Sequence, residues 1–145
     1  MKRSYYEEYK QKLITPEKAA GLIKPVDYIL YGSFLSRPVD FDNCLAQRIH
    51  ELTEINIFYG AGLLPPLQTA MCDPEHRVFT CNSCYFSAVD RKMHDKGLLY
   101  YTPANFSQAN EMFTLPTYPP YTCVVQVAPM DEHGFFSVGV GDTYC

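Results

Sequence analysis

The sequence contains no tryptophan and no long apolar run. A transmembrane helix needs about 20 consecutive apolar residues, and the charged N-terminus, MKRSYYEEYKQK, lacks the apolar stretch of a secretory signal peptide. Positive charge is also scarce, because 12 lysines and arginines face 16 acidic residues and leave a net charge of −4. A nucleic-acid binder needs a basic face. We therefore expect a cytoplasmic protein that binds neither a membrane nor nucleic acid.

What the chain does contain is enough apolar material for one folded domain. Hydrophobic residues make up 47% of its 145 residues and charged residues 19%. This balance is typical of a globular domain and excludes intrinsic disorder. The 11 prolines predict many short connections between elements.

The six cysteines have two interpretations. Disulfides form in oxidising compartments, and no secretion signal supports that location, so we interpret the cysteines as small apolar residues. The alternative is a zinc site, because Cys81 and Cys84 have CxxC spacing and Cys72 and His76 lie nearby in the sequence. A structural zinc site usually needs two ligand pairs, and no second CxxC is present. We expect no metal.

Helix and strand patterns alternate along the first half of the chain. Thr15 is a cap residue that is followed by a proline and an acid, which predicts a helix start. A strand is predicted at 26–31 and another at 55–59, with a helix between them that Asp40 or Asp42 caps. Strand, helix and strand within about 35 residues predict a crossover and a parallel pair. The predicted face of that helix consists of Phe41, Leu45, Ile49 and Leu52.

The second half continues the alternation, so we predict an α/β fold with a largely parallel sheet and flanking helices. Residues 90–96 alternate in charge and predict a solvated helix face. Besides the helix that starts after Thr15 and ends before Pro25, the predicted helices outside the first crossover lie at 4–13, 87–96 and 103–113. The predicted strands lie near 78–80 and at 98–101 and 121–128, with a hairpin partner at 135–140.

Three loops are candidates for a ligand site, because ligands of open parallel sheets bind past the carboxyl ends of the strands. They are residues 32–38, 60–66 and 129–134, and each contains glycine. Glycine lets backbone N–H groups approach an anion or a developing oxyanion. No Walker loop, GxGxxG fingerprint or Gly-x-Ser-x-Gly elbow is present. The residues alone therefore predict an α/β domain with glycine-rich loops for a small anionic ligand.

His133 could transfer protons, but we favour a structural role for it in a turn. Asp131 can bond its own backbone two residues further on, and Gly134 can supply a positive φ.

Several segments, taken together and in order, indicate a family more specifically than any single motif does. They are residues 15–20 (TPEKAA), Tyr31-Gly32-Ser33 with Pro38 behind it, 82–91 (NSCYFSAVDR), 100–103 (YYTP) and 127–139 (VAPMDEHGFFSVG). With them the chain resembles the N-terminal domain of the acetyl-CoA hydrolase/transferase family, especially its 4-hydroxybutyrate and butyryl-CoA:acetate CoA-transferase branch. The resemblance runs through nearly the whole chain, and the closing P-x-D-x-H-G-aromatic-x-S-x-G stretch is its most specific part.

The resemblance implies one half of a CoA-transferase (NagB/RpiA-like) fold. It implies an enzyme that moves CoA between a short-chain acyl-CoA and a small carboxylate, of the acetate, butyrate or 4-hydroxybutyrate type, through a glutamyl-CoA intermediate. The CoA thioester is then a substrate, and no cofactor is covalently bound. The nucleophilic glutamate belongs to the C-terminal half of the family, so no residue of 1–145 is assigned a catalytic role.

The resemblance also implies which residues lie near the substrate. Gly32, Ser33, Phe34 and Pro38 line the acyl or oxyanion pocket, and Asp131, His133 and Gly134 form a turn near the cleft. The loop after the first strand has fewer glycines than is usual in the family, which implies a differently shaped acyl pocket.

We expect residues 1–145 to be a truncated N-terminal domain that is inactive alone. We also expect its own C-terminal half or a symmetric copy to cover it, in a homo-oligomer. The alternatives are a non-catalytic α/β module that binds an anion or a partner, an acetyl-CoA hydrolase that uses the same scheme, and a sugar-phosphate isomerase of related fold. The isomerase is disfavoured because no phosphate-binding lysine loop is evident.

Overall fold

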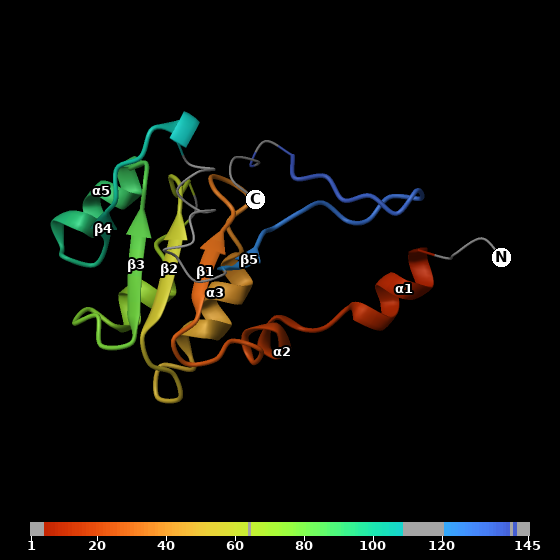
Figure 1. Cartoon of the computed structure of the whole chain (residues 1–145), viewed down its shortest axis with the longest axis horizontal. Coiled ribbons are helices and arrows are strands. Elements are labelled where there is room, and N and C mark those ends of the chain that lie inside the picture. The colour runs from red at the N-terminus through yellow and green to blue at the C-terminus, as the bar shows by residue number, and fades with distance from the viewer. Residues whose placement is uncertain (1–4, 64, 109–120, 140, 142–145) are drawn as a thin grey trace.

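The computed structural model describes residues 5–63, 65–108, 121–139 and 141, which form a sheet with flanking helices and a projecting arm (Figure 1). The elements in chain order are α1 (Tyr5–Lys12), α2 (Pro16–Ala20), β1 (Tyr28–Tyr31), α3 (Val39–Ala46), β2 (Ile55–Tyr59), α4 (Gln68–Cys72), β3 (Phe79–Ser83), α5 (Ala88–Asp95), β4 (Tyr100–Tyr101), the 3₁₀ helix η1 (Phe106–Gln108) and β5 (Tyr121–Val124).

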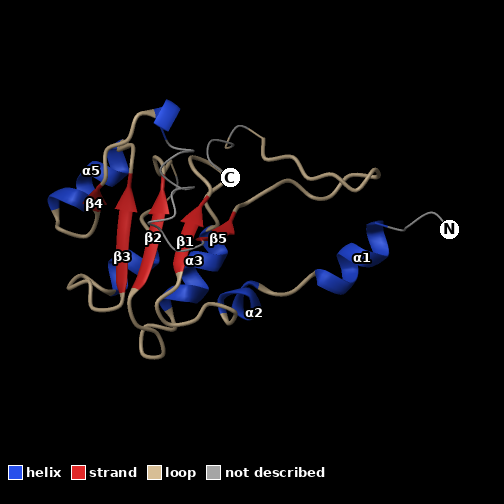
Figure 2. Ribbon diagram, in the orientation of Figure 1, coloured by secondary structure: helices blue, strands red, loops and turns tan. Residues whose placement is uncertain are grey.

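The sheet has the order β4-β3-β2-β1-β5, and every pairing in it is parallel. Ile29 lies opposite Ile57, and Ile57 lies opposite Cys81, so the central strands are in register over their buried residues. The predicted α/β fold with a largely parallel sheet is confirmed. All carboxyl ends of the strands therefore meet at one edge, which is uppermost in Figure 2.

The core lies between the sheet and the helices α3 and α4, which stand behind the sheet in Figure 2. In β2 the residues Ile55, Ile57 and Tyr59 are buried, whereas Asn56 and Phe58 on the other face are half-buried. The side chains therefore alternate along β2 between a helix-covered face and a face that the described residues cover less completely.

Local capping explains two helix starts. Thr15 Oγ1 accepts a hydrogen bond from the Lys18 backbone N–H at the start of α2, as predicted. Ser87 and Asp90 form a capping box at the start of α5, in which each side chain accepts from the other residue's backbone N–H.

The helix predicted to reach Leu52 is shorter, and its predicted cap is wrong. The observed α3 ends at Ala46 and follows Pro38, with no side-chain cap. Asp42 lies inside the helix and is buried, because its carboxylate accepts hydrogen bonds from α4 instead. Tertiary contact thus replaced the local capping role that its sequence position favoured.

Two other predicted elements differ in extent. The helix predicted at 103–113 contains only η1 among the described residues, and 109–113 lie outside them. The strand predicted at 121–128 ends at Val124, where the chain leaves the sheet. The predicted partner at 135–140 runs beside 128–131 but is not a strand over its described residues, and residue 140 lies outside them.

Residues 125–138 and α1 together form the projection on the right of Figure 1, which we call the arm. The rings of Tyr9 and Phe136 pack with centroids 5.7 Å apart, and Gly134 lies against the Tyr5 ring. At the tip, Asp131 Oδ1 accepts from the backbone N–H of His133 at 2.9 Å. Gly134 has a φ of +87°. The local geometry expected for this turn is therefore present.

The buried carboxylate of Asp73 holds the turn that leads into β3. Its oxygens accept hydrogen bonds from the backbone N–H groups of Arg77, Val78 and Phe79, at 3.1, 2.7 and 2.8 Å. Burial raises the pKa of the Asp73 carboxyl, but the three hydrogen bonds outweigh burial and hold the pKa below its usual range. The ionised carboxylate therefore stabilises the fold at neutral pH.

The substitution Asp73→Asn is expected to lower the free energy of unfolding at pH 7 by about 2 kcal/mol, because the amide turns N–H groups toward backbone donors. Since the pKa of Asp73 is depressed in the folded state, its contribution to the free energy of unfolding is complete above the unfolded-state pKa of about 3.9. This contribution is lost as pH falls through the folded-state pKa. Urea unfolding across this range checks it, with the exposed Asp95→Asn as control. A stability difference from wild type that does not shrink in acid would contradict this account.

Candidate functional site

The loops that follow β1 and β2 lie side by side at the carboxyl edge of the sheet, over residues 32–38 of the first loop and the described residues 60–63, 65 and 66 of the second. We call them the loop pair. The backbone N–H of Phe34 donates to the Ala61 carbonyl at 2.9 Å, and a parallel bridge joins Phe34 to Gly62. Ser33 Oγ accepts from the Gly60 N–H at 3.1 Å. The two loops are therefore joined by backbone and side-chain bonds into one unit.

The backbone N–H groups of the glycines in the loop pair, whose sequence position favoured an anion or oxyanion site, are engaged within the protein. Each already has an acceptor within the protein. The acceptors for the glycines at 32, 60 and 62 are, in that order, the Val124 carbonyl at 3.0 Å, Ser33 Oγ at 3.1 Å and Asp90 Oδ2 at 2.9 Å. The glycines serve close packing, since a Cβ on Gly32 would lie 2.4 Å from the Ser36 carbonyl oxygen.

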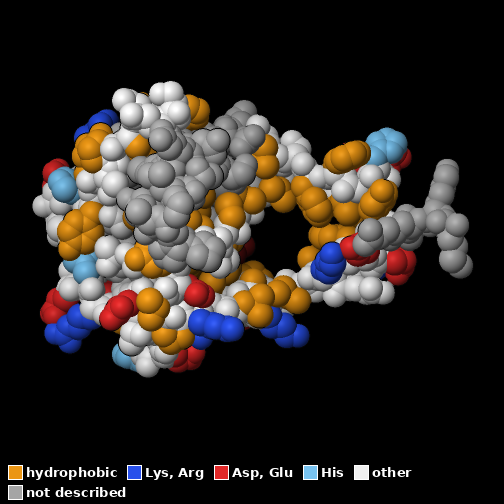
Figure 3. All heavy atoms as spheres, in the orientation of Figure 1, with side chains coloured by type: hydrophobic (Ala, Val, Ile, Leu, Met, Phe, Trp, Pro, Cys, Tyr) orange, Lys and Arg blue, Asp and Glu red, His pale blue; other side chains and the backbone are white. Residues whose placement is uncertain are grey.

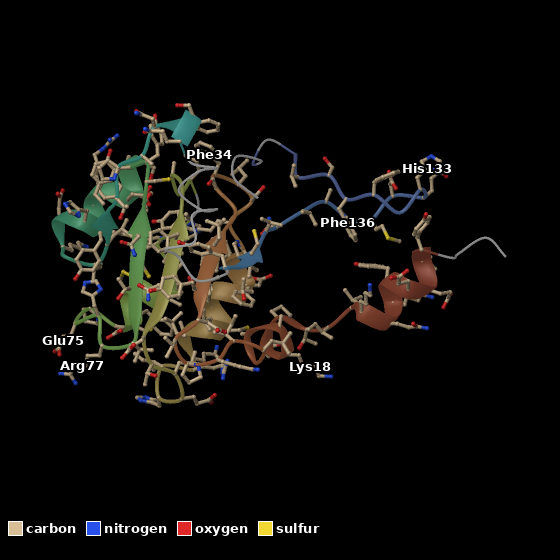
Figure 4. All side chains as sticks on the ribbon, in the orientation of Figure 1. Lys18, Phe34, Glu75, Arg77, His133 and Phe136 are labelled. Carbon is tan, nitrogen blue, oxygen red and sulfur yellow. The ribbon has the colours of Figure 1, made fainter. Side chains whose placement is uncertain are left out.

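The four residues expected to line the pocket differ in exposure. Gly32, Ser33 and Pro38 are buried, whereas Phe34 is half-buried and lies at the upper end of the sheet in Figure 4. Phe34 has a φ of +54°, which is strained for a bulky residue. Such strain is often found at functional sites. Phe34 is therefore the one member of the four whose side chain is partly accessible.

The third candidate loop lies elsewhere. His133 is exposed at the tip of the arm, far from Phe34 in Figure 4, and it faces Glu132 at 3.5 Å. Backbone hydrogen bonds, led by that from Phe135, hold the pKa of the Asp131 carboxyl below its usual range. The structure thus does not bring this turn together with the loop pair within the chain.

The carboxylate of Asp90, in α5, links this helix to the second loop of the loop pair by hydrogen bonds. Its Oδ1 accepts the Tyr59 hydroxyl proton at 2.6 Å. Its Oδ2 accepts from the backbone N–H groups of Gly62 and Ser87, at 2.9 and 2.8 Å. The side chain is fully buried, with 0% exposure. The alternating charges of residues 90–96 predicted a solvated helix face, which is wrong for Asp90, although the Ser-x-x-Asp capping spacing was a signal for it.

Arg37 is buried beside Asp90 and was not predicted as a site residue. It is 2% exposed, and its Nη2 donates to the Pro65 carbonyl of the second loop. Its Nε and Nη1 have no hydrogen-bond partner within the described part of the chain. A methyl group at Gly62 would lie 2.7 Å from Arg37 Nη1 and 3.1 Å from Asp90 Oδ1. The absence of a side chain at Gly62 thus leaves space for the buried Arg37 guanidinium and the buried Asp90 carboxylate next to it.

Asp42 is a second buried carboxylate in this region. It accepts from Thr69 Oγ1 at 2.7 Å, from the Gln68 N–H at 2.6 Å and from the Tyr31 hydroxyl at 3.4 Å. Burial raises the pKa of the Asp42 carboxyl, and the hydrogen bonds and the charge of Arg37 oppose it only in part. Because Asp42 and Asp90 are both buried and already accept several bonds, neither is placed to act as a nucleophile.

The CxxC cysteines, Cys81 and Cys84, are buried thiols. Burial, with a smaller effect of the Asp42 charge, raises the pKa of Cys81 well above its usual range, so its thiol stays neutral. Among the described residues, no group of three or more His, Cys, Asp or Glu side chains is arranged to hold a metal ion. Within the same residues, no helix is long and apolar enough to cross a bilayer.

Comparison with known proteins places this geometry in a family. The model for the acetyl-CoA hydrolase/transferase N-terminal domain matches residues 1–144. A butyryl-CoA:acetate CoA-transferase of Anaerostipes caccae is 36% identical over 136 residues, which are 94% of this chain and 30% of that protein. A probable butyrate:acetyl-CoA coenzyme A-transferase of Syntrophomonas wolfei is 35% identical over 100% of this chain and 32% of its own length.

The fold comparison agrees. A crystal structure of RipA from Yersinia pestis superposes with a TM-score of 0.76 and 26% sequence identity, over 97% of this chain and 34% of that one. The chain thus spans about a third of the length of the proteins it matches. The family match covers nearly all of the chain, including the sheet, the loop pair and the arm. The chain belongs to the acetyl-CoA hydrolase/transferase family and corresponds to its N-terminal domain.

Proposed function

We propose that this chain is the N-terminal part of a CoA-transferase that moves CoA between a short-chain acyl-CoA and a small carboxylate. The observation that carries the proposal is the match over residues 1–144, which includes the loop pair at the carboxyl edge of a parallel sheet. The names of the relatives, which act on butyrate and acetate, support short acyl chains.

The catalytic nucleophile is proposed to be a glutamate in a second α/β half of the full-length protein. This carboxylate attacks the acyl-CoA carbonyl, which forms an acyl-glutamyl anhydride and releases CoA thiolate. The thiolate attacks the glutamyl carbonyl, which gives a glutamyl-CoA thioester and frees the carboxylate product. A second carboxylate then takes over CoA by the reverse steps. The chain's span of about a third of its relatives supports a further half, and CoA substrates support a cytoplasmic location.

The role of the described residues is to build one rigid wall of the acyl site. Phe34 presents the accessible side chain, and the bonds of Asp90 and the Ser33 hydroxyl fix the loops that hold it. Since the glycine N–H groups of the loop pair are occupied, we propose that the donors for the tetrahedral oxyanions come from the second half.

A CoA-exchange assay tests the proposed function. The full-length protein is expected to convert acetyl-CoA and butyrate into butyryl-CoA and acetate, measured by chromatography of the CoA esters. Residues 1–145 alone are expected to give no transfer, because they lack the proposed nucleophile. Absence of transfer from acetyl-CoA to butyrate, propionate and 4-hydroxybutyrate in the full-length protein would contradict the proposal. Hydrolysis without transfer would assign the hydrolase reaction instead.

The substitution Phe34→Ala in the full-length protein is expected to widen the acyl site. The ratio of kcat/KM for hexanoate to that for acetate should rise by about tenfold, since a hydrophobic pocket discriminates by at least that factor per methylene. Phe135→Ala, which alters an exposed side chain on the arm, is the matched control. An unchanged ratio in Phe34→Ala would show that this ring does not face the acyl chain.

The substitution Asp90→Asn is expected to loosen the loop pair, because its amide replaces one of two acceptor oxygens that receive three donors. A loss of about 2 kcal/mol in stability is expected. A fall of about tenfold in kcat should accompany it, as small displacements of positioning groups slow catalysis. Thermal unfolding and steady-state kinetics of the full-length protein measure both, with Asp95→Asn as the exposed control. If Asp90→Asn matched that control in both, Asp90 would not be holding the loops.

A further inference from the structure

The arm borders an open cavity of about 610 Å³. Apolar and aromatic side chains dominate its lining, among them Tyr5, Tyr9, Leu13, Ile14, Met130 and Phe136. Figure 3 shows an opening between the arm and the body of the protein, framed largely by hydrophobic side chains. In Figure 4 the Phe136 side chain lies on the side of the arm that faces α1, in keeping with its ring contact to Tyr9. The cavity thus belongs to the arm and is separate from the loop pair.

The apolar residues that line the cavity are strongly exposed to solvent, which is unfavourable for a protein without a partner at this surface. The exposed fractions are 60% for Leu13, 47% for Ile14 and 47% for Phe136. Soluble monomers rarely expose contiguous apolar patches of more than a few hundred Å², and larger ones mark interaction sites. Burial of these side chains would add hydrophobic free energy in proportion to the area covered. The surface is therefore suited to a partner.

The charged residues around the cavity favour an apolar protein surface, rather than a charged ligand, as the occupant of the cavity. Among the described residues, the charged side chains that line it are Glu8 and Lys12, and they neutralise each other at 2.8 Å. His133 and Glu132 lie on the exposed tip and pair with each other. No net charge is thus directed into the cavity from the arm's described elements.

We propose that the arm clasps an apolar face of the segment that follows residue 145 in the full-length protein. This inference rests on the proposed function, which requires a second half. The relatives are about three times as long as this chain, so much of their length is available to fill the cavity. Gly141, the last residue that the structure describes, is buried beside Ser36 at the base of the arm. Such a segment docks intramolecularly, at high effective concentration, whereas a second copy must diffuse to the site.

The base of the arm connects this docking surface to the loop pair. The Ser36 carbonyl accepts from the Gln126 N–H at 2.8 Å, and Ser36 Oγ donates to the Val138 carbonyl at 3.2 Å. One residue of the first loop therefore holds both limbs of the arm. Phe34 lies two residues away in the same loop. A segment held in the arm is consequently fixed relative to Phe34, which would set the second half against the acyl wall.

Photo-crosslinking in the full-length protein tests the occupant. Phe136→p-benzoylphenylalanine places the probe in the cavity, and Phe135→p-benzoylphenylalanine, 71% exposed on the neighbouring residue, is the matched control. A mixture of ¹⁵N-labelled and unlabelled protein distinguishes intramolecular from intermolecular products by mass spectrometry. The Phe136 probe is expected to couple to peptides beyond residue 145 of the same molecule, at least fivefold more than the Phe135 probe. Products within residues 1–145 alone, or mixed-isotope products from a second copy, would overturn the proposal.

A second measurement does not depend on the probe. Phe136→Ser in the full-length protein should speed trypsin cleavage between the halves by at least fivefold, whereas Phe135→Ser should leave it unchanged. Equal cleavage in the two variants would overturn the clasp. The wild-type CoA-exchange assay keeps the two proposals apart. Crosslinks without CoA transfer would support the docking of the arm and contradict the transferase function. CoA transfer without crosslinks would support the transferase function and contradict the docking of the arm.

Discussion

The architecture of the candidate site depends on one buried carboxylate. Asp90 has no exposed surface, and its two oxygens receive donors from β2, from the loop after β2 and from the start of α5. A buried carboxylate without partners is costly, so the fold is stable only when these donors are in place. The positions of the second loop and of α5 are therefore set together. The first loop is tied to the second, and through Ser36 the arm is tied to the first.

The parts of this structure that could be predicted from sequence are those that local chemistry decides. Two apolar runs on either side of an amphipathic helix predicted the parallel pair of β1 and β2, and the register of Ile29 with Ile57 agrees. Thr15 and Asp131 bond backbone groups only two or three residues away, so their side-chain contacts could be read from spacing. The family resemblance rested on ordered motifs and is confirmed over residues 1–144.

The missed features depend on partners that are distant in the chain. Asp42 accepts a hydrogen bond from Thr69, 27 residues away, so its carboxylate is buried in the core and does not cap the helix. Asp90 sits in a segment of alternating charge that indicates solvent, and besides the local Ser87 N–H its donors are the distant Tyr59 and Gly62. Glycine positions in the loops were visible in the sequence, but the acceptors of their N–H groups were not. Sequence therefore predicted which loops lie at the carboxyl edge of the sheet, whereas the partners of their backbone groups became visible only in the structure.

The contact between Arg37 and Gly62 has a consequence for how this domain can vary. A side chain at position 62 would collide with the guanidinium of Arg37, and a change at Arg37 would leave Asp90 and Asp42 with less balancing charge. The two positions are therefore coupled: a methyl group at 62 requires the Arg37 guanidinium to shift or residue 37 to be shorter. A paired exchange at 37 and 62 would therefore disturb this corner of the domain less than either single change.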